Sequence, residues 1–147
     1  MTTYAASAPA SAPSSPVPAS QDPQVLVAAR VPLELYIRGH AEDSAEHMRA
    51  AFLPTARLDS RRDGPLTSWT LDFYCQRFKN QPAADEAQRR RTIDLLDVTG
   101  TAAMAKVTLV HGAMTFVDYF VLVQTDDGWK IASKTFHALP TQEGSAA

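Results

Sequence analysis

Apolar residues recur at helical spacing in three segments of the first half of the chain. From residue 24 onward an apolar side chain stands every three or four positions, which predicts a long helix that ends at Gly39. Residues 43–53 predict a second, short helix before Pro54, and Asp43 and Glu46 have the spacing of a capping box. A third helix is predicted after Thr70 as its N-cap. Its apolar stripe consists of Leu71, Tyr74, Cys75 and Phe78.

The second half of the chain reads as a series of strands. Four strands are predicted over residues 91–98, 102–110, 114–125 and 129–138. They are separated by Thr99-Gly100, Gly112-Ala113 and Asp127-Gly128, and such short turns predict an antiparallel meander. A further short strand is predicted over residues 56–61, closed by a turn at residues 63–65. Helices first and strands last are typical of an α+β domain.

The turns also predict which side chains share a face of the sheet. If Asp127-Gly128 is a two-residue turn, Asp118 lies opposite His137, Phe120 opposite Thr135, and Leu122 opposite Ser133. A two-residue turn at Gly112-Ala113 likewise places Val107 opposite Asp118. A three-residue turn would shift the register by one residue and separate Asp118 from His137.

The predicted sheet is substantially apolar on both faces, and three short helices can cover only one of them. The second face carries Tyr119, Val121, Val123 and Phe136. An exposed apolar patch of this kind indicates a partner, and a homodimer through the sheet is the simplest one.

Composition and charge narrow the class of protein. Residues 1–22 are almost wholly Ala, Ser, Pro and Thr, and we expect a disordered tail there, followed by one domain over residues 23–139 and a loose tail over residues 140–147. The net charge of −2 favours neither nucleic acid nor an anionic membrane as a partner, and the basic run at residues 89–91 is expected to be a solvated strand start. No apolar stretch is long enough to span a membrane. The single cysteine, Cys75, is expected in the core, and its isolation favours a reducing, cytoplasmic location.

Several strings resemble one known family. They are residues 35–39, residues 48–58, residues 97–103, Phe116-Val117-Asp118-Tyr119, Gly128-Trp129-Lys130-Ile131 and Lys134-Thr135-Phe136-His137. Together they resemble the nuclear-transport-factor-2-like superfamily, in its branch described as "putative lumazine-binding" and close to the SnoaL-type polyketide cyclases. The resemblance covers roughly residues 24–138. It implies a cone-shaped curved sheet around an interior pocket, usually dimeric, in a superfamily that holds both enzymes and non-catalytic binding proteins.

Asp118 is the first candidate for chemistry. A carboxylate among Phe116, Phe120 and Leu122 needs a partner or a raised pKa, and His137 is the expected partner. The pair is a candidate for general-base catalysis, for orienting a ligand, or for structure alone. Candidate ligand-binding residues are Tyr36 and Trp69 as aromatic walls, with Phe120 and Ser133 on the same predicted face.

Other chemistries lack their residue patterns. His40, His47, His111 and His137 are not at metal-ligand spacing, and no phosphate loop or nucleophile elbow occurs, so that neither a metal nor a cofactor is expected. Two hypotheses remain. One is a non-catalytic pocket protein for a mostly apolar or aromatic small molecule, and the other is a cofactor-free cyclase, isomerase or dehydratase with Asp118 as general base.

Overall fold

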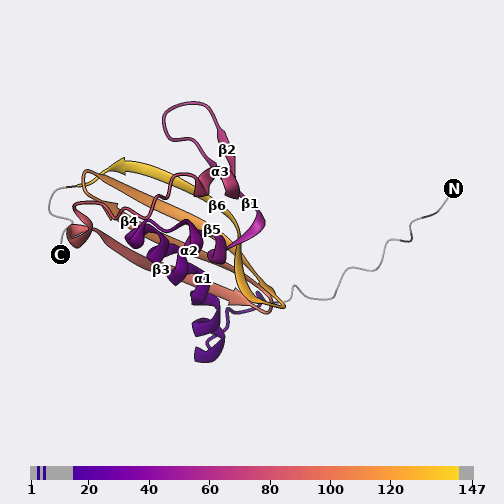
Figure 1. The fold of residues 1–147 in the computed structure, drawn as a ribbon. Coiled ribbons are helices and arrows are strands. Elements are labelled where there is room, and N and C mark those ends of the chain that lie inside the picture. The colour runs from indigo at the N-terminus through magenta and orange to yellow at the C-terminus, as the bar shows by residue number, and fades with distance from the viewer. Residues whose placement is uncertain (1–2, 4, 6–14, 143–147) are drawn as a thin grey trace.

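Helices cover one face of a curved sheet in the computed structural model, which describes residues 3, 5 and 15–142 (Figure 1). The helices are α1 (Pro23–Glu42), α2 (Ala45–Ala51) and α3 (Leu71–Cys75), with a short 3-10 turn η1 (Glu86–Gln88). The strands are β1 (Phe52–Ser60), β2 (Thr67–Thr70), β3 (Arg90–Thr99), β4 (Ala102–His111), β5 (Met114–Thr125) and β6 (Gly128–Pro140). They form one sheet in the order β2-β1-β6-β5-β4-β3. The α+β prediction is confirmed, but the sheet is mixed and not purely antiparallel, because β1 runs parallel to β6.

Helix α1 is longer than its sequence pattern predicted. The Asp22 side chain accepts a hydrogen bond from the Gln24 N–H at 2.9 Å and caps its first turn. The helix ends at Asp43, which takes the left-handed conformation with φ 53°. The predicted stop at Gly39 is wrong: this glycine lies inside the helix, where an added Cβ would stand 2.9 Å from Met48 Sδ. Gly39 is therefore explained by the close approach of α2.

The second and third helices begin at hydroxyl caps. Ser44, and not the predicted Asp43, accepts a hydrogen bond from the His47 N–H at 3.2 Å. Thr70 caps α3 as predicted, accepting from the Phe73 N–H at 3.1 Å. Strand β1 already begins at Phe52, so that Pro54 lies within a strand and does not terminate the helix.

The register of β6 differs from the prediction in two ways. The turn residues are Asp126 and Asp127 and not Asp127 and Gly128, since Thr125 pairs with Gly128. Next to the turn, each residue of β5 therefore pairs two positions away from its predicted partner on β6, and its side chain stays on the predicted face. A bulge at Ala132 then adds one residue between the pairs Leu122–Ile131 and Val121–Ser133. Beyond the bulge the faces are exchanged. The predicted Asp118–His137 pairing is therefore wrong: Asp118 lies opposite Phe136.

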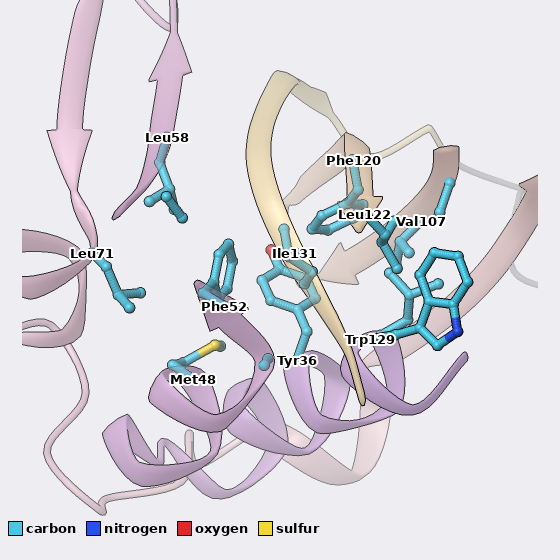
Figure 2. Close-up of a cluster of buried hydrophobic side chains, with 14 of the residues drawn as sticks. Tyr36, Met48, Phe52, Leu58, Leu71, Val107, Phe120, Leu122, Trp129 and Ile131 are labelled. Carbon is cyan, nitrogen blue, oxygen red and sulfur yellow. The ribbon is translucent and has the colours of Figure 1, made fainter. Parts of the chain in front are cut away.

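The core lies between the helices and the concave face of the sheet (Figure 2). Tyr36 reaches up from α1 towards Ile131 and Phe120, and all three are 0–2% exposed. Cys75 is buried as predicted, and Trp129 is buried as well. The β4–β5 register is also confirmed, with Val107 opposite Asp118.

The opposite face of the sheet leaves large apolar side chains in solvent. Leu95, Met104, Tyr119 and Val121 are 46–51% exposed there. Phe136, which was predicted on this face, is turned to the concave side by the bulge. In the described part of the chain, no helix is long and apolar enough to cross a membrane.

The predicted N-terminal tail lies partly outside the described residues. At its end, however, the Ser20 N–H donates to the Val98 carbonyl at 2.7 Å, and Asp22 caps α1. Residues 1–2, 4, 6–14 and 143–147, which belong to the two predicted tails, lie outside the description.

Candidate functional site

A cavity of about 250 Å³ opens between the helices and the concave face of the sheet. Its walls come from α1, α3 and strands β1, β2, β4, β5 and β6. The lining residues are Tyr36, His40, Ser60, Arg62, Thr67, Trp69, Tyr74, Arg77, Leu109, His111, Phe116, Asp118, Lys134 and Phe136. Five of them are Phe, Tyr or Trp residues, so aromatic side chains are the most numerous kind in the lining.

A buried chain of three polar side chains forms one wall. Lys134 Nζ donates a hydrogen bond to the Tyr36 hydroxyl oxygen at 2.9 Å, and the Tyr36 hydroxyl donates to Asp118 Oδ2. Lys134 Nζ lies 3.8 Å from the same carboxylate oxygen. All three side chains are at most 5% exposed. Each charge is therefore paired, as burial requires.

Burial changes the proton affinities of this wall. It raises the pKa of Asp118, an effect that Lys134 and the Tyr36 hydrogen bond partly offset. Burial lowers the pKa of Lys134, and the negative charge of Asp118 partly offsets this decrease. Burial also raises the pKa of Tyr36 well above its usual value. Both ionised groups of the pair are thus shifted towards their neutral forms.

Two histidines and a tyrosine form a second wall. His40 Nε2 lies 3.3 Å from the Tyr74 hydroxyl, and its ring meets the His111 ring edge-on at 5.3 Å between centroids. His111 Nε2 accepts a hydrogen bond from Arg91 Nε at 3.0 Å. Burial, followed by nearby cations, lowers the pKa of His111 to about 4 and that of His40 well below its usual value. Both imidazoles are therefore neutral near pH 7.

The side chain of Arg91 departs from the sequence expectation of a solvated basic run. It is 5% exposed and holds Glu86 with two hydrogen bonds, at 2.7 and 2.8 Å. This bidentate pair fixes the Arg91 guanidinium against His111. The residue thus supports the second wall from behind.

Two exposed arginines stand where the cavity opens to solvent. The guanidinium carbon of Arg77 lies 4.7 Å from the centre of the Trp69 ring, and that of Arg62 lies 5.2 Å from the Phe116 ring. Stacking on an aromatic face positions each guanidinium without burying it. The opening is therefore positively charged and aromatic.

The predicted site residues are only partly brought together. Asp118, Tyr36 and Trp69 line the cavity. His137 does not, because it pairs with Val117 and is exposed on the convex face. Ser133 also faces away from the cavity, for the same reason: the bulge at Ala132 reverses the faces of β6.

Phe120 and Lys134 also lie differently from what the sequence led us to expect. Phe120 is buried behind Tyr36, with 5.0 Å between ring centroids, and supports the wall without lining it. Lys134 lines the cavity, although it was not among the site residues expected from the sequence. Strand β6 also carries Lys130, Ser133, Thr135 and His137, so no pattern in the sequence marked Lys134 as a cavity residue. Tyr74 was recognised only as part of a helix stripe, and His40 only as an unlikely metal ligand.

Among the residues that the structure describes, no three His, Cys, Asp or Glu side chains are gathered as metal ligands.

Comparison with known proteins identifies the family. The family model described as "Putative lumazine-binding" matches residues 24–137, which run from the first turn of α1 to near the end of β6. The chain belongs to this family. No curated protein matches it.

Solved structures place this member of the family in the nuclear-transport-factor-2-like fold. A nuclear-transport-factor-2-like protein of unknown function from Shewanella baltica is 24% identical, with a TM-score of 0.73 over 83% of this chain and 99% of that one. A similar protein from Methylobacillus flagellatus is 25% identical, with a TM-score of 0.71 over 83% and 98%. A ketosteroid isomerase-like protein from Erwinia carotovora atroseptica is 10% identical, with a TM-score of 0.60 over 80% and 98%. These likenesses show the fold.

Proposed function

We propose that this chain binds a small, mostly aromatic molecule that carries one acidic group. The observation that supports this most is the cavity of about 250 Å³ with five Phe, Tyr or Trp residues in its lining. An apolar, largely preformed hollow with a few polar groups is the usual form of a small-molecule site. The family description, with its reference to lumazine, a fused aromatic ring system, agrees with a planar ligand.

The acidic group follows from the charges that face the cavity. Lys134, Arg62 and Arg77 are cationic residues in its lining, whereas Asp118 is the one carboxylate among the described lining residues. The carboxylate is already bound by Tyr36. An anionic ligand would add hydrogen bonds to guanidinium groups at the opening, and such charge-assisted bonds are stronger than neutral ones.

Trp69 offers a direct test, because it lines the cavity and the chain has only one other tryptophan. In a Trp129→Phe background, the fluorescence of Trp69 should change saturably with 4-hydroxybenzoate and with lumazine. 4-Hydroxybenzamide, which lacks the charge, should bind about ten-fold more weakly. Cyclohexanecarboxylate, which lacks the ring, should bind weakly as well. The proposal is wrong if no aromatic acid gives a saturable change.

A pair of arginine variants separates the cavity from general surface charge. Arg77→Gln should weaken the binding of 4-hydroxybenzoate, because this guanidinium stands at the opening over Trp69. Arg30→Gln is the matched control, since Arg30 lies on α1 and, among the residues that the structure describes, pairs only with Glu34 on the surface. Equal weakening by both variants would contradict a defined site.

A second hypothesis is a cofactor-free cyclase, isomerase or dehydratase with Asp118 as general base. One observation favours it: Asp118 lines the cavity with a pKa raised by burial, and a base works best when its pKa approaches the working pH. Aryl ketones incubated with the protein in D₂O should then exchange their α-protons, as followed by NMR. Asp118→Asn should abolish the exchange while retaining binding. Binding without exchange would leave the first hypothesis alone.

We also propose that two copies associate through the convex face of the sheet. The support is the cluster of four exposed apolar side chains from β3, β4 and β5, namely Leu95, Met104, Tyr119 and Val121. A patch of this kind on a sheet is unusual for a monomer. The bulge removes Phe136 from the surface that we first expected.

The cytoplasm is the compartment that we propose. The support is the cysteine content: Cys75 is the single cysteine, and it is buried with a free thiol whose pKa is raised by burial. A lone unreactive thiol fits a reducing compartment. Fractionation of the source cells with an antibody against the chain would test this.

A further inference from the structure

The amino group of Lys134 has surroundings unlike those of an ordinary lysine. Its Nζ lies 4.9 Å from the centre of the Tyr74 ring and 5.1 Å from the centres of the Tyr36 and Phe136 rings. The side chain is 5% exposed, yet it lines the cavity. The amine is thus withdrawn from bulk water and reachable only by a molecule inside the cavity.

The polar contacts of this amine leave it free to react. Within the described part of the chain, its one hydrogen bond is to the Tyr36 hydroxyl at 2.9 Å. Asp118 Oδ2, at 3.8 Å, is too far for a hydrogen bond but near enough to exchange a proton through Tyr36, which hydrogen-bonds to both groups. An ammonium has three N–H donors, so two directions from Nζ are not used by Tyr36.

We propose that Lys134 forms a Schiff base with an aromatic aldehyde or ketone bound in this cavity. The inference rests on the proposed function, because the carbonyl compound must first enter the aromatic cavity. It adds a covalent step and a substrate class, carbonyl compounds, to that function. A buried lysine with aromatic neighbours is the type of lysine that attacks carbonyl groups.

The step balances with the groups present. Lys134 gives a proton to Asp118, through the Tyr36 hydroxyl, and the neutral amine attacks the carbonyl carbon. A C–N bond forms, the π electrons pass to the oxygen, and proton transfers between nitrogen, oxygen and the Asp118 carboxyl give a neutral carbinolamine. The C–O bond then breaks with protonation of the oxygen, so that water leaves and a protonated imine remains. Burial supports the first transfer, since it lowers the pKa of Lys134 and raises that of Asp118.

Reductive trapping on the full chain tests the proposal. The protein is mixed with 4-formylbenzoate and sodium cyanoborohydride, which reduces an imine to a stable secondary amine, and the modified lysine is located by peptide mass spectrometry. Lys134 should carry the adduct at short times, about ten-fold or more above the exposed Lys79. The proposal is overturned if labelling follows solvent exposure, with Lys79 modified and Lys134 not. This readout needs no variant, so a poorly folded mutant cannot obscure it.

Two variants test the proton route, and one ligand without a carbonyl group separates binding from Schiff-base formation. Asp118→Asn removes the proton acceptor and should slow trapping at Lys134, whereas Lys79→Met should leave it unchanged. Unchanged trapping in Asp118→Asn would overturn the proton route. 4-(Hydroxymethyl)benzoate has the shape of the probe but no carbonyl group, and Trp69 fluorescence reports its binding. If it binds and Lys134 is not trapped, the Schiff base is wrong and the proposed binding function stands; if it does not bind and no trapping occurs, the binding function itself fails.

Discussion

Asp118 and Lys134 form a buried ion pair although they are not directly opposed in the sheet. Asp118 lies opposite Phe136 and Lys134 opposite Phe120, yet Nζ comes within 3.8 Å of Oδ2. The pair forms because the bulge at Ala132 turns Lys134 to the concave face, and because Tyr36 from α1 bridges the two groups. The contact therefore depends on an irregular strand and on a helix far away in sequence.

This pair predicts strong energetic coupling. Asp118→Asn leaves the buried Lys134 without an opposite charge beside it, and Lys134→Met does the same to Asp118. Each substitution should therefore lower the free energy of unfolding. The double variant should lose less than the sum, with a coupling of roughly 0.5–3 kcal/mol in denaturant titrations. Arg49 and Asp72 serve as the control, because they form a shorter contact of 2.6 Å with both side chains exposed and should show little coupling. Additive effects in both cycles would contradict a buried interaction.

The effect of Gly39→Ala on the stability of the protein should change sign when Met48 is replaced by alanine. An added Cβ at Gly39 would stand 2.8 Å from Met48 Cε, so Gly39→Ala should destabilise the protein by about 1–3 kcal/mol through overpacking. In a Met48→Ala background that space is open, and Gly39→Ala should then stabilise by about 1 kcal/mol through helix propensity. Thermal unfolding of the four proteins measures both effects. Equal effects in the two backgrounds would show that α2 does not restrict this position.

Regular elements could be predicted from the sequence because their signals are local. The stripe from Leu71 to Phe78 predicted α3, although the helix ends already at Cys75. The turn at residues 112–113 predicted the β4–β5 register. Strand β2 was missed, since its four residues, Thr67–Thr70, include one large apolar side chain, Trp69, and are too few to show alternation. The bulge at Ala132 carries no sequence signal, because an alanine is compatible with either face of a strand. That one residue decides whether His137 or Lys134 joins Asp118, which is why the site was predicted only in part.

His111 predicts how stability varies with pH. Its pKa is about 4 in the folded chain, against about 6.5 in an unfolded one, so the unfolded chain binds more protons between these values. The free energy of unfolding should therefore be greatest above pH 6.5 and fall as the pH is lowered towards 4. His40, whose pKa is also lowered, contributes in the same direction.

The His111→Gln variant isolates this effect. Glutamine can still accept the hydrogen bond from Arg91, but it does not titrate. The nearby Glu86, with its lowered pKa, and the more distant Asp118, with its raised pKa, titrate in both proteins and largely cancel in the difference. The stability of the wild type relative to the variant should decrease from pH 6.5 to pH 4. A flat difference would contradict the lowered pKa.

The N-terminal segment should divide into two parts. A variant that begins at Ser15 should unfold at the same temperature as the full chain, because the removed residues lack apolar periodicity. One that begins at Pro23 loses the bond from Ser20 to Val98 and the Asp22 cap, and should lose about 1 kcal/mol or more. Asp22→Ala in the full chain separates the cap from the backbone bond. Equal stability of the two shortened chains would show that neither contact matters.

The convex face predicts the state of association. If the face with Tyr119 and Val121 joins two copies, light scattering at micromolar concentration should give twice the chain mass. Val121→Glu should yield a folded monomer, because Val121 is 51% exposed in one copy and the charge disturbs only the interface. Val27→Glu is the matched control: Val27 is 65% exposed on α1, away from the sheet surface, and this variant should remain a dimer. A wild type that stays monomeric at all concentrations would leave the apolar face without a second copy, and a Val121→Glu variant that still dimerises would place the interface elsewhere.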